Sequence, residues 1–103
     1  MKYLVENKVY DTEKAKKIIK YIKPIKTKGI FGFISYPRYI HTLYKTKKGQ
    51  FFVYIGEYVE DSDISVSSKD EIELLSDDEV KEILNELNAI DVYQQLFDDL
   101  EEG

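Results

Sequence analysis

The most constraining feature of the sequence is a pair of β-prone segments, residues 39–45 and 50–58, joined by the turn sequence Thr46-Lys47-Lys48-Gly49. Glycine at the end of this turn can adopt the positive φ that tight hairpin connections require. Leu43 and Tyr44 face the region of aromatic residues on the returning strand, and such cross-strand pairs stabilise antiparallel sheets. The sequence therefore predicts an antiparallel hairpin near the middle of the chain.

A second, smaller hairpin is predicted at the N-terminus. Lys2–Val5 and Lys8–Tyr10 are β-rich fragments, and Glu6-Asn7 between them is suited to a tight turn. The two fragments are short, so we expect this hairpin to be a minor element of the fold.

Two more β-prone segments complete the predicted strands. Residues 30–36 are β-prone and end at Pro37, and residues 71–75 are expected to form a last edge strand. The acidic, serine-rich segment 60–68 is interpreted as an exposed loop. Three aromatic side chains of the first segment are expected in the core: Phe31, Phe33 and Tyr36.

A helix is predicted in the N-terminal half, beginning at an N-cap formed by Asp11 or Thr12. Pro24 would end this helix at about Lys23. Four apolar residues fall at the i, i+3, i+4, i+7 spacing of an amphipathic helix: Ala15, Ile18, Ile19 and Ile22.

Two helices are predicted in the C-terminal part. Ser76-Asp77-Asp78-Glu79 has the pattern of a capping box. The apolar stripe of the helix that follows is Val80, Ile83, Leu84 and Leu87. Asp91 is expected to cap a second, short helix, and the acidic segment 98–102 is expected to fray. The stripe of that helix is Ile90, Tyr93, Leu96, Phe97 and Leu100.

Together these elements predict an α+β fold with an antiparallel meander sheet of about four to five strands, one helix in the N-terminal half and two C-terminal helices. The helices are expected to cover one side of the sheet. A chain of 103 residues is expected to form a single domain, residues 1–103. No apolar run approaches the length of a membrane span, so we expect a soluble, cytoplasmic protein.

Charge is distributed very unevenly along the chain. Residues 1–50 carry thirteen Lys/Arg and three Asp/Glu, a balance of +10, whereas residues 51–103 carry two lysines and seventeen Asp/Glu, a balance of −15. Such asymmetry indicates either a nucleic acid or a charged protein partner. The alternative is that the two halves pack together and partly neutralise each other within the fold.

Signals for catalysis or metal binding are poor. The sequence has no cysteine and one histidine, His41, which is interpreted as a structural strand residue because it lacks partners for acid–base or metal chemistry. Asp61-Ser62-Asp63 resembles the start of a calcium loop, but Val66 and Ile72 stand where that loop requires glycine and glutamate. No nucleophile elbow or P-loop is present. We therefore expect no enzyme activity, no catalytic residue, no cofactor and no metal.

RNA-recognition signatures also fail on close inspection. Lys28–Tyr36 comes near the aromatic signature of an RNA-recognition motif, but the inserted Ile30 would turn the later side chains to the opposite face of the strand. Gly29-Ile30-Phe31-Gly32 has the spacing of a KH loop, but that loop joins two helices and here a strand is predicted to follow. Neither fold is expected.

One resemblance covers most of the chain in order. It is carried by Tyr10-Asp11-Thr12-Glu13-x-Ala15 after a short strand, Thr42-Leu43-Tyr44-Lys45-Thr46-Lys47-Lys48-Gly49-Gln50-Phe51-Phe52, Leu75-Ser76-Asp77-Asp78-Glu79-x-Lys81 and Asp91-x-Tyr93-x-x-Leu96-Phe97. These motifs resemble a family of small accessory proteins from phages, plasmids and conjugative elements of low-GC Gram-positive bacteria. Residues 24–38 depart from the pattern. The motifs themselves are structural signals, so the family lends no site residue.

Several anti-CRISPR proteins resemble this family, which implies inhibition of a type II CRISPR effector nuclease in the cytoplasm of the bacterial host. Such an effector holds its heteroduplex in a positively charged channel, which a cluster of carboxylates could occupy as a phosphate mimic. The predicted contact residues are Glu57, Glu60, Asp61, Asp63, Asp70, Glu71 and Glu73, with further carboxylates on the predicted helix at Asp77, Asp78, Glu79, Glu82 and Glu86.

A nucleic-acid-binding accessory protein is the alternative, with guide RNA among its conceivable ligands. Aromatic residues interleave with the basic ones in the N-terminal half, as in proteins that bind single strands. The residues that would contact nucleic acid are Lys14, Lys17, Lys20, Lys47 and Lys48. A nuclease acting on guide RNA is disfavoured by the lone histidine.

Overall fold

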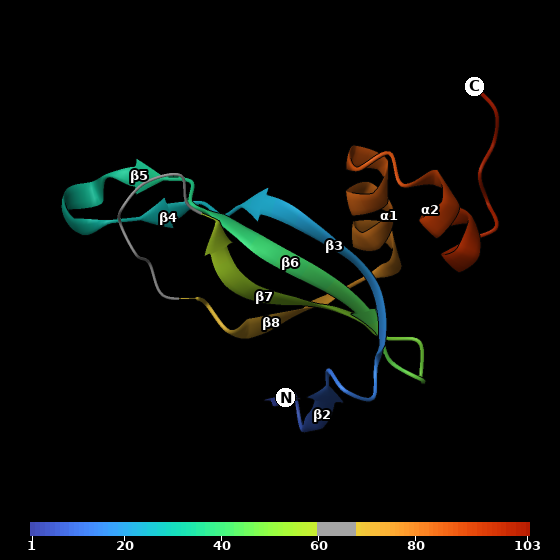
Figure 1. Ribbon diagram of the computed structural model, residues 1–103, viewed down its shortest axis with the longest axis horizontal. Coiled ribbons are helices and arrows are strands. Elements are labelled where there is room, and N and C mark those ends of the chain that lie inside the picture. The colour runs from blue at the N-terminus through green and yellow to red at the C-terminus, as the bar shows by residue number, and fades with distance from the viewer. Residues whose placement is uncertain (60–67) are drawn as a thin grey trace.

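The β6–β7 hairpin lies at the centre of the fold (Figure 1). The computed structural model describes residues 1–59 and 68–103. Strand β6 (Arg38–Lys45) pairs antiparallel with β7 (Phe51–Val59). The Thr46 N–H donates to Gln50 O at 2.9 Å, and Gly49 has a φ of 91°. The predicted turn at Thr46–Gly49 is thus confirmed.

The main sheet has four antiparallel strands in the order β3-β6-β7-β8. Strand β3 (Lys16–Pro24) lies on one edge and β8 (Glu71–Leu75) on the other, which confirms the predicted edge strand at 71–75. Two hairpins form separate two-stranded sheets: β1 (Lys2–Val5) with β2 (Lys8–Asp11), and β4 (Thr27–Lys28) with β5 (Ile34–Ser35).

The predicted N-terminal hairpin is confirmed in both its strands and its turn. Tyr3 pairs with Tyr10 and Val5 with Lys8, so Glu6-Asn7 forms the two-residue connection. Both turn residues have positive φ, 50° and 64°, as a type I′ hairpin turn requires.

The predicted N-terminal-half helix is wrong. The Asp11 carboxylate does accept the Glu13 N–H at 2.9 Å, but the chain completes a single turn, closed by Ala15 N–H to Asp11 O at 3.0 Å. It then continues as β3, paired with β6. Isoleucine and tyrosine are stiff or bulky residues that favour strands, and pairing with β6 outweighs the helical spacing of the isoleucines.

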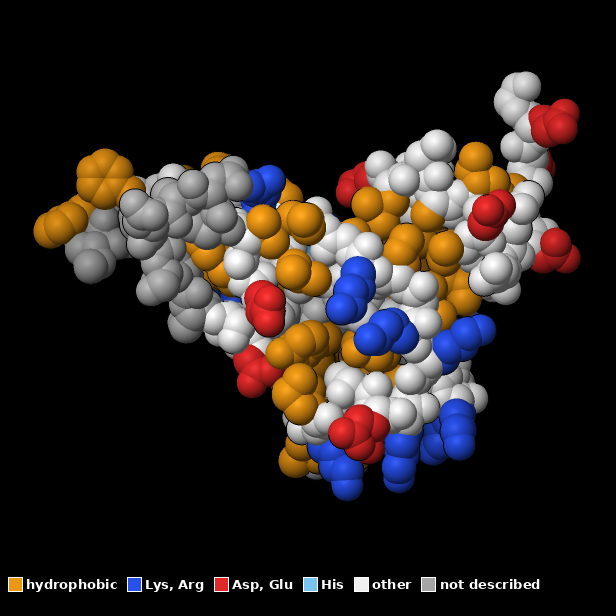
Figure 2. All heavy atoms as spheres, viewed as in Figure 1, with side chains coloured by type: hydrophobic (Ala, Val, Ile, Leu, Met, Phe, Trp, Pro, Cys, Tyr) orange, Lys and Arg blue, Asp and Glu red, His pale blue; other side chains and the backbone are white. Residues whose placement is uncertain are grey.

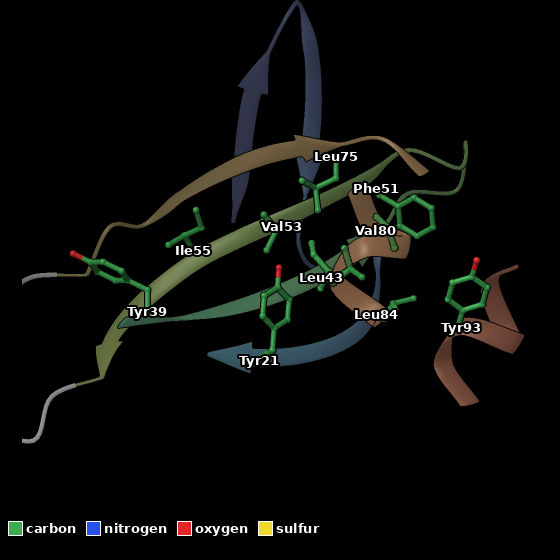
Figure 3. Packing of buried hydrophobic residues seen from close by; sticks show 11 residues of the cluster. Tyr21, Tyr39, Leu43, Phe51, Val53, Ile55, Leu75, Val80, Leu84 and Tyr93 are labelled. Carbon is green, nitrogen blue, oxygen red and sulfur yellow. The ribbon is translucent and has the colours of Figure 1, made fainter. Parts of the chain in front are cut away.

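Each face of the sheet buries its own apolar cluster. On the helix face, Leu43, Phe51 and Val53 pack with residues of the two helices, as Figure 3 shows. On the opposite face, Tyr10 of the N-terminal hairpin packs on Tyr44 and Phe52. The ring centroids of Tyr44 and Phe52 lie 5.1 Å apart in a stacked arrangement, and Tyr10 meets Phe52 edge-on at 5.6 Å.

The two C-terminal helices are confirmed as α1 (Asp77–Glu86) and α2 (Ile90–Leu96). Ser76 Oγ accepts the Glu79 N–H at 3.2 Å, and the Glu79 carboxylate accepts the Ser76 N–H at 3.1 Å, which completes the predicted capping box. Three residues of the predicted first stripe are buried: Val80, Ile83 and Leu84; Leu87 is exposed.

The second helix differs from the prediction in detail. Its N-cap is Ala89, without a side-chain hydrogen bond, and Asp91 lies in the first turn. Tyr93 is buried, whereas Ile90 and Leu100 are exposed. In the acidic C-terminal segment, the Asp99 carboxylate lies 2.8 Å from Lys81 Nζ and also interacts with the Tyr93 hydroxyl.

Residues 27–36 form an arm that projects beyond the end of the main sheet (Figure 1). The strand predicted over 30–36 is present only as β5, preceded by a 3₁₀ turn (Ile30–Gly32) in which Phe31 and Gly32 have positive φ. The expectation that the aromatics of this segment lie in the core is wrong. Their exposed fractions are 92% for Phe31, 74% for Phe33 and 62% for Tyr36.

The α+β class, the antiparallel sheet and the two C-terminal helices are therefore shown. The loop predicted over 60–68 lies outside the described residues except for Ser68, which is exposed. Within the described parts of the chain, no helix is both long and apolar enough to cross a membrane.

Candidate binding surfaces

A groove opens on the helix face of the sheet, between β8 and α1, with a volume of about 330 Å³. Strand β8 alternates Glu71-Ile72-Glu73-Leu74, so Glu71 and Glu73 face the helices while Ile72 and Leu74 face the N-terminal hairpin. Helix α1 contributes three more carboxylates. We name this site the glutamate groove after Glu71, Glu73, Glu79, Glu82 and Glu86.

Two aromatic rings, both buried, lie side by side in this groove. The rings of Tyr21 and His41 stack with centroids 5.1 Å apart, on paired positions of β3 and β6. The Nδ1 atom of His41 lies 2.9 Å from Tyr39 O, so the ring is held in one orientation. The sequence-based interpretation of His41 as a strand residue fits this setting.

Electrostatics in the groove follow from burial and from the glutamates. Burial raises the pKa of Tyr21 to about 12, and the nearby charges of Glu73 and Glu86 act in the same direction. Burial also lowers the pKa of His41, because the charged imidazolium is poorly solvated; Lys23 adds to this effect, whereas the hydrogen bond to Tyr39 opposes it. Near neutral pH, the Tyr21 and His41 side chains are therefore both uncharged, and they line the same groove as the glutamates.

The structure separates the predicted acidic contact residues into different surfaces. Glu71 and Glu73 line the glutamate groove, whereas Glu57 is exposed on β7 and is not among its lining residues. Three further predicted residues, Glu60, Asp61 and Asp63, lie outside the described residues. Tyr21 and His41 were not predicted as site residues. The alternation of Glu71 and Glu73 with Ile72 and Leu74 on β8 was a visible signal, but the pairing of β3 with β6 that adds Tyr21 and His41 was not.

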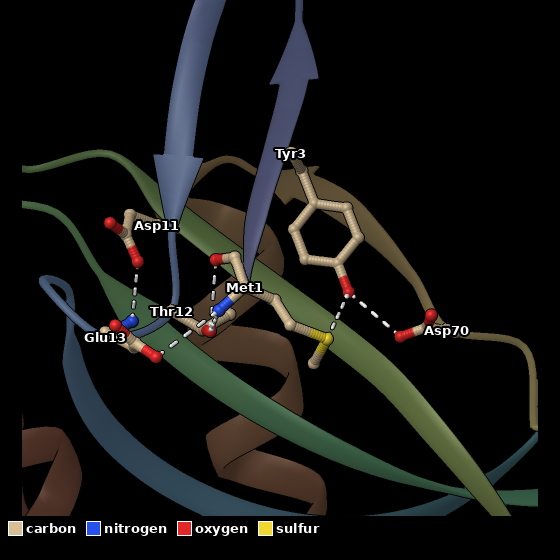
Figure 4. Close-up of polar contacts among 6 residues, drawn as sticks. All are labelled: Met1, Tyr3, Asp11, Thr12, Glu13 and Asp70. Carbon is tan, nitrogen blue, oxygen red and sulfur yellow. Dashed lines mark hydrogen bonds and ion pairs between the residues drawn. The ribbon is translucent and has the colours of Figure 1, made fainter.

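Asp70 has a structural role on the other side of the sheet. Its carboxylate accepts hydrogen bonds from Tyr54 Oη at 2.6 Å and from Tyr3 Oη at 3.0 Å, and Figure 4 shows the bond to Tyr3 of the N-terminal hairpin. These two bonds hold the pKa of Asp70 below its ordinary value. The same interaction with Asp70 raises the pKa of Tyr54. Asp70 thus links the hairpin to β7.

This link predicts a specific pH dependence. A carboxylate whose pKa is depressed by folding adds stability above its ordinary pKa of 3.8, and that stability is lost as the pH falls through the lower folded-state value. We therefore expect Asp70→Asn to unfold at lower urea concentration than wild type at neutral pH, with a difference that shrinks toward about pH 2. Asp98→Asn, which removes an exposed carboxylate elsewhere, is the matched control. An equal Asp70→Asn difference at both pH values would contradict the assignment.

A second groove, of about 480 Å³, lies between the N-terminal hairpin and the β6–β7 turn. We name it the lysine groove after Lys8, Lys14, Lys47 and Lys48, which line it together with Asp11. Figure 2 shows the basic side chains gathered at this end of the molecule. Three of the predicted nucleic-acid contacts, Lys14, Lys47 and Lys48, thus lie around the same groove, together with Lys8. Lys17 and Lys20 are exposed on β3 and are not among the lining residues.

No group of three or more histidine, aspartate or glutamate residues within ranges 1–59 and 68–103 is arranged to hold a metal ion. Comparison of the chain with protein-family models, with curated proteins and with solved structures found no match.

Proposed function

We propose that this protein inhibits a type II CRISPR effector nuclease by binding the effector and blocking access of guide RNA or DNA. The contact is the glutamate groove with the neighbouring carboxylates of α1. The clustering of five glutamates from two elements around one concave site carries this proposal. The ordered motifs that resemble anti-CRISPR-related accessory proteins name the class of partner.

Complementary charge gives this contact its physical basis. The channel of the effector is positively charged and reads the heteroduplex mainly through its backbone geometry. Helix α1 places Asp77, Asp78 and Glu79 in its first turn, next to the groove, so carboxylates extend beyond the groove onto the helix end. Attraction between such surfaces speeds encounter and weakens as salt is raised.

A second candidate function is supported by the lysine groove. Four lysines around one concavity favour contact with phosphates, which suits a nucleic-acid-binding accessory protein of a mobile genetic element. In that case the ligand would be RNA or DNA itself, and the effector would be bound only through its guide.

A pull-down that uses this protein as bait separates the two candidates. The three samples offered to it are effector without guide RNA, effector loaded with guide RNA, and free guide RNA. Immobilised protein is expected to retain a purified type II effector without guide RNA, less of it after guide loading, and no free guide RNA. Raising the salt concentration should weaken retention of the effector. Retention of free guide RNA, with retention of the effector only when it carries guide, would exclude the first candidate and support the second.

A further inference from the structure

The glutamate groove has two acidic walls. Glu71 and Glu73 project from β8, and Glu79, Glu82 and Glu86 project from α1 across the concavity. Lys23 is the one cationic side chain among the described residues that line it. Lys69 Nζ lies 3.7 Å from the Glu71 carboxylate, and the Glu79 carboxylate accepts the Ser76 N–H. The preference of the groove for a positively charged ligand therefore rests mainly on Glu73, Glu82 and Glu86.

The inner surface of the groove is apolar. Val53, Ile55 and Leu75 from the sheet and Ile83 from α1 lie between and below the carboxylates. Such a surface suits the methylene groups of a long basic side chain, whose charged end can reach the acidic rim. A volume of about 330 Å³ is near the lower end for ligand sites, which fits one side chain better than a whole helix.

Tyr21 supplies a polar group that has no hydrogen-bond partner among residues 1–59 and 68–103. The side chain belongs to a residue only 8% exposed, yet its hydroxyl has no hydrogen bond to any described residue. Among those residues, no polar side-chain atom is both fully buried and unpartnered, so the hydroxyl oxygen opens on the groove that Tyr21 lines. Figure 3 shows this hydroxyl directed across the sheet toward Val53.

His41 offers an acceptor beside it. With Nδ1–H donating to Tyr39 O, the neutral imidazole keeps the lone pair on Nε2. Burial favours this neutral form by lowering the pKa of the ring. The groove therefore combines carboxylate oxygens with two neutral acceptors, and a ligand with several donors in fixed directions can use both.

We propose that the glutamate groove binds the guanidinium group of an arginine side chain presented by the partner. A guanidinium has five N–H donors in a planar fork, which match carboxylates pairwise and can also reach the Tyr21 hydroxyl. It is less strongly hydrated than an ammonium group and stacks well on aromatic rings, so arginine is favoured over lysine here. The inference rests on the proposed function only in taking the effector as the source of that arginine.

Titration of the protein alone with N-acetyl-arginine amide tests this, followed by amide NMR. We expect saturable shifts confined to the groove, around Tyr21, Glu73 and Ile83. N-acetyl-citrulline amide has nearly the same shape without the charge and should give no saturable shifts. N-acetyl-lysine amide should bind about two- to fivefold more weakly than the arginine compound.

Variants assign the interaction to named groups. Glu73→Gln and Glu86→Gln should each weaken arginine amide binding about two- to fivefold, while Glu57→Gln, which removes an exposed carboxylate outside the groove, should not. Tyr21→Phe should weaken binding without changing the charge. Equal binding of the citrulline compound, or shifts spread over all exposed carboxylates, would overturn the inference.

The outcome is separable from that of the proposed function. If arginine amide binds the groove but the pull-down retains no effector, the guanidinium site stands and the effector is not its partner. If the effector is retained but arginine amide gives no groove shifts in wild type, the inference is wrong while the proposed function stands.

Discussion

Replacing Phe52 with alanine is expected to lower the free energy of unfolding by about 3–5 kcal/mol. Phe52 is fully buried on the hairpin face, where its ring contacts those of Tyr10 and Tyr44. Truncation would leave a cavity between the main sheet and the N-terminal hairpin, and neighbours on a paired strand can fill it only in part. Urea unfolding followed by circular dichroism measures the effect.

Phe31→Ala is the matched control for that experiment. It removes the same side chain from the projecting arm, where Phe31 is 92% exposed, so we expect a change within about 0.5 kcal/mol. A large loss of stability in Phe31→Ala would restore the sequence-based expectation that this residue belongs to the core. A small loss in Phe52→Ala would contradict the described packing of the hairpin on the sheet.

The largest functional effect is expected from reversing two charges in the glutamate groove. The double variant Glu73→Lys, Glu86→Lys should bind the effector about 10- to 100-fold more weakly, because two attractive contacts become repulsive in a site that faces positive charge. Nuclease inhibition should fall in parallel. Both residues are exposed, so the variant should keep the circular dichroism spectrum of wild type.

Two control variants limit the interpretation. Glu57→Lys with Asp98→Lys makes the same change in net charge at exposed positions outside the groove and should affect binding far less. Lys14→Gln with Lys47→Gln alters the lysine groove. Loss of inhibition in the lysine variant, with the glutamate variant unaffected, would favour the nucleic-acid-binding function.

Features set by local interactions could be predicted from the sequence. The capping box at Ser76 and the hairpin turn at Thr46–Gly49 each depend on hydrogen bonds between residues at most four positions apart. The signal at Asp11 was also real, because its carboxylate closes a turn. It did not determine what followed, since a turn can begin a helix or simply redirect the chain.

Features set by distant residues could not be predicted in the same way. Ile18, Ile19 and Ile22 fit helical spacing, but the segment pairs with β6, whose partner residues lie between 14 positions (Pro24 with Arg38) and 29 positions (Lys16 with Lys45) further along the chain. Apolar spacing in a short segment does not reveal such a partner. Similarly, the aromatic composition of residues 30–36 favours burial, but that segment folds on itself as a separate hairpin with few neighbours.

The acidic character of the candidate site could be predicted from the sequence, but the set of residues that the fold brings together around the groove could not. Glu71 and Glu73 were expected to be exposed carboxylates, and they are. Their grouping with Glu82 and Glu86 depends on how α1 packs over the sheet. Asp70 precedes β8, has a positive φ of 52°, and its carboxylate accepts hydrogen bonds from two tyrosines on the hairpin face of the sheet. A count of charges along the chain contains neither piece of information.

Amide hydrogen exchange of the protein alone and in complex with a type II effector tests the central claim most directly. If the glutamate groove is the contact, exchange should slow in β8 and along α1, while residues 7–15 and 46–50 around the lysine groove keep their free-state rates. Slower exchange around the lysine groove, with β8 and α1 unchanged, would contradict the account.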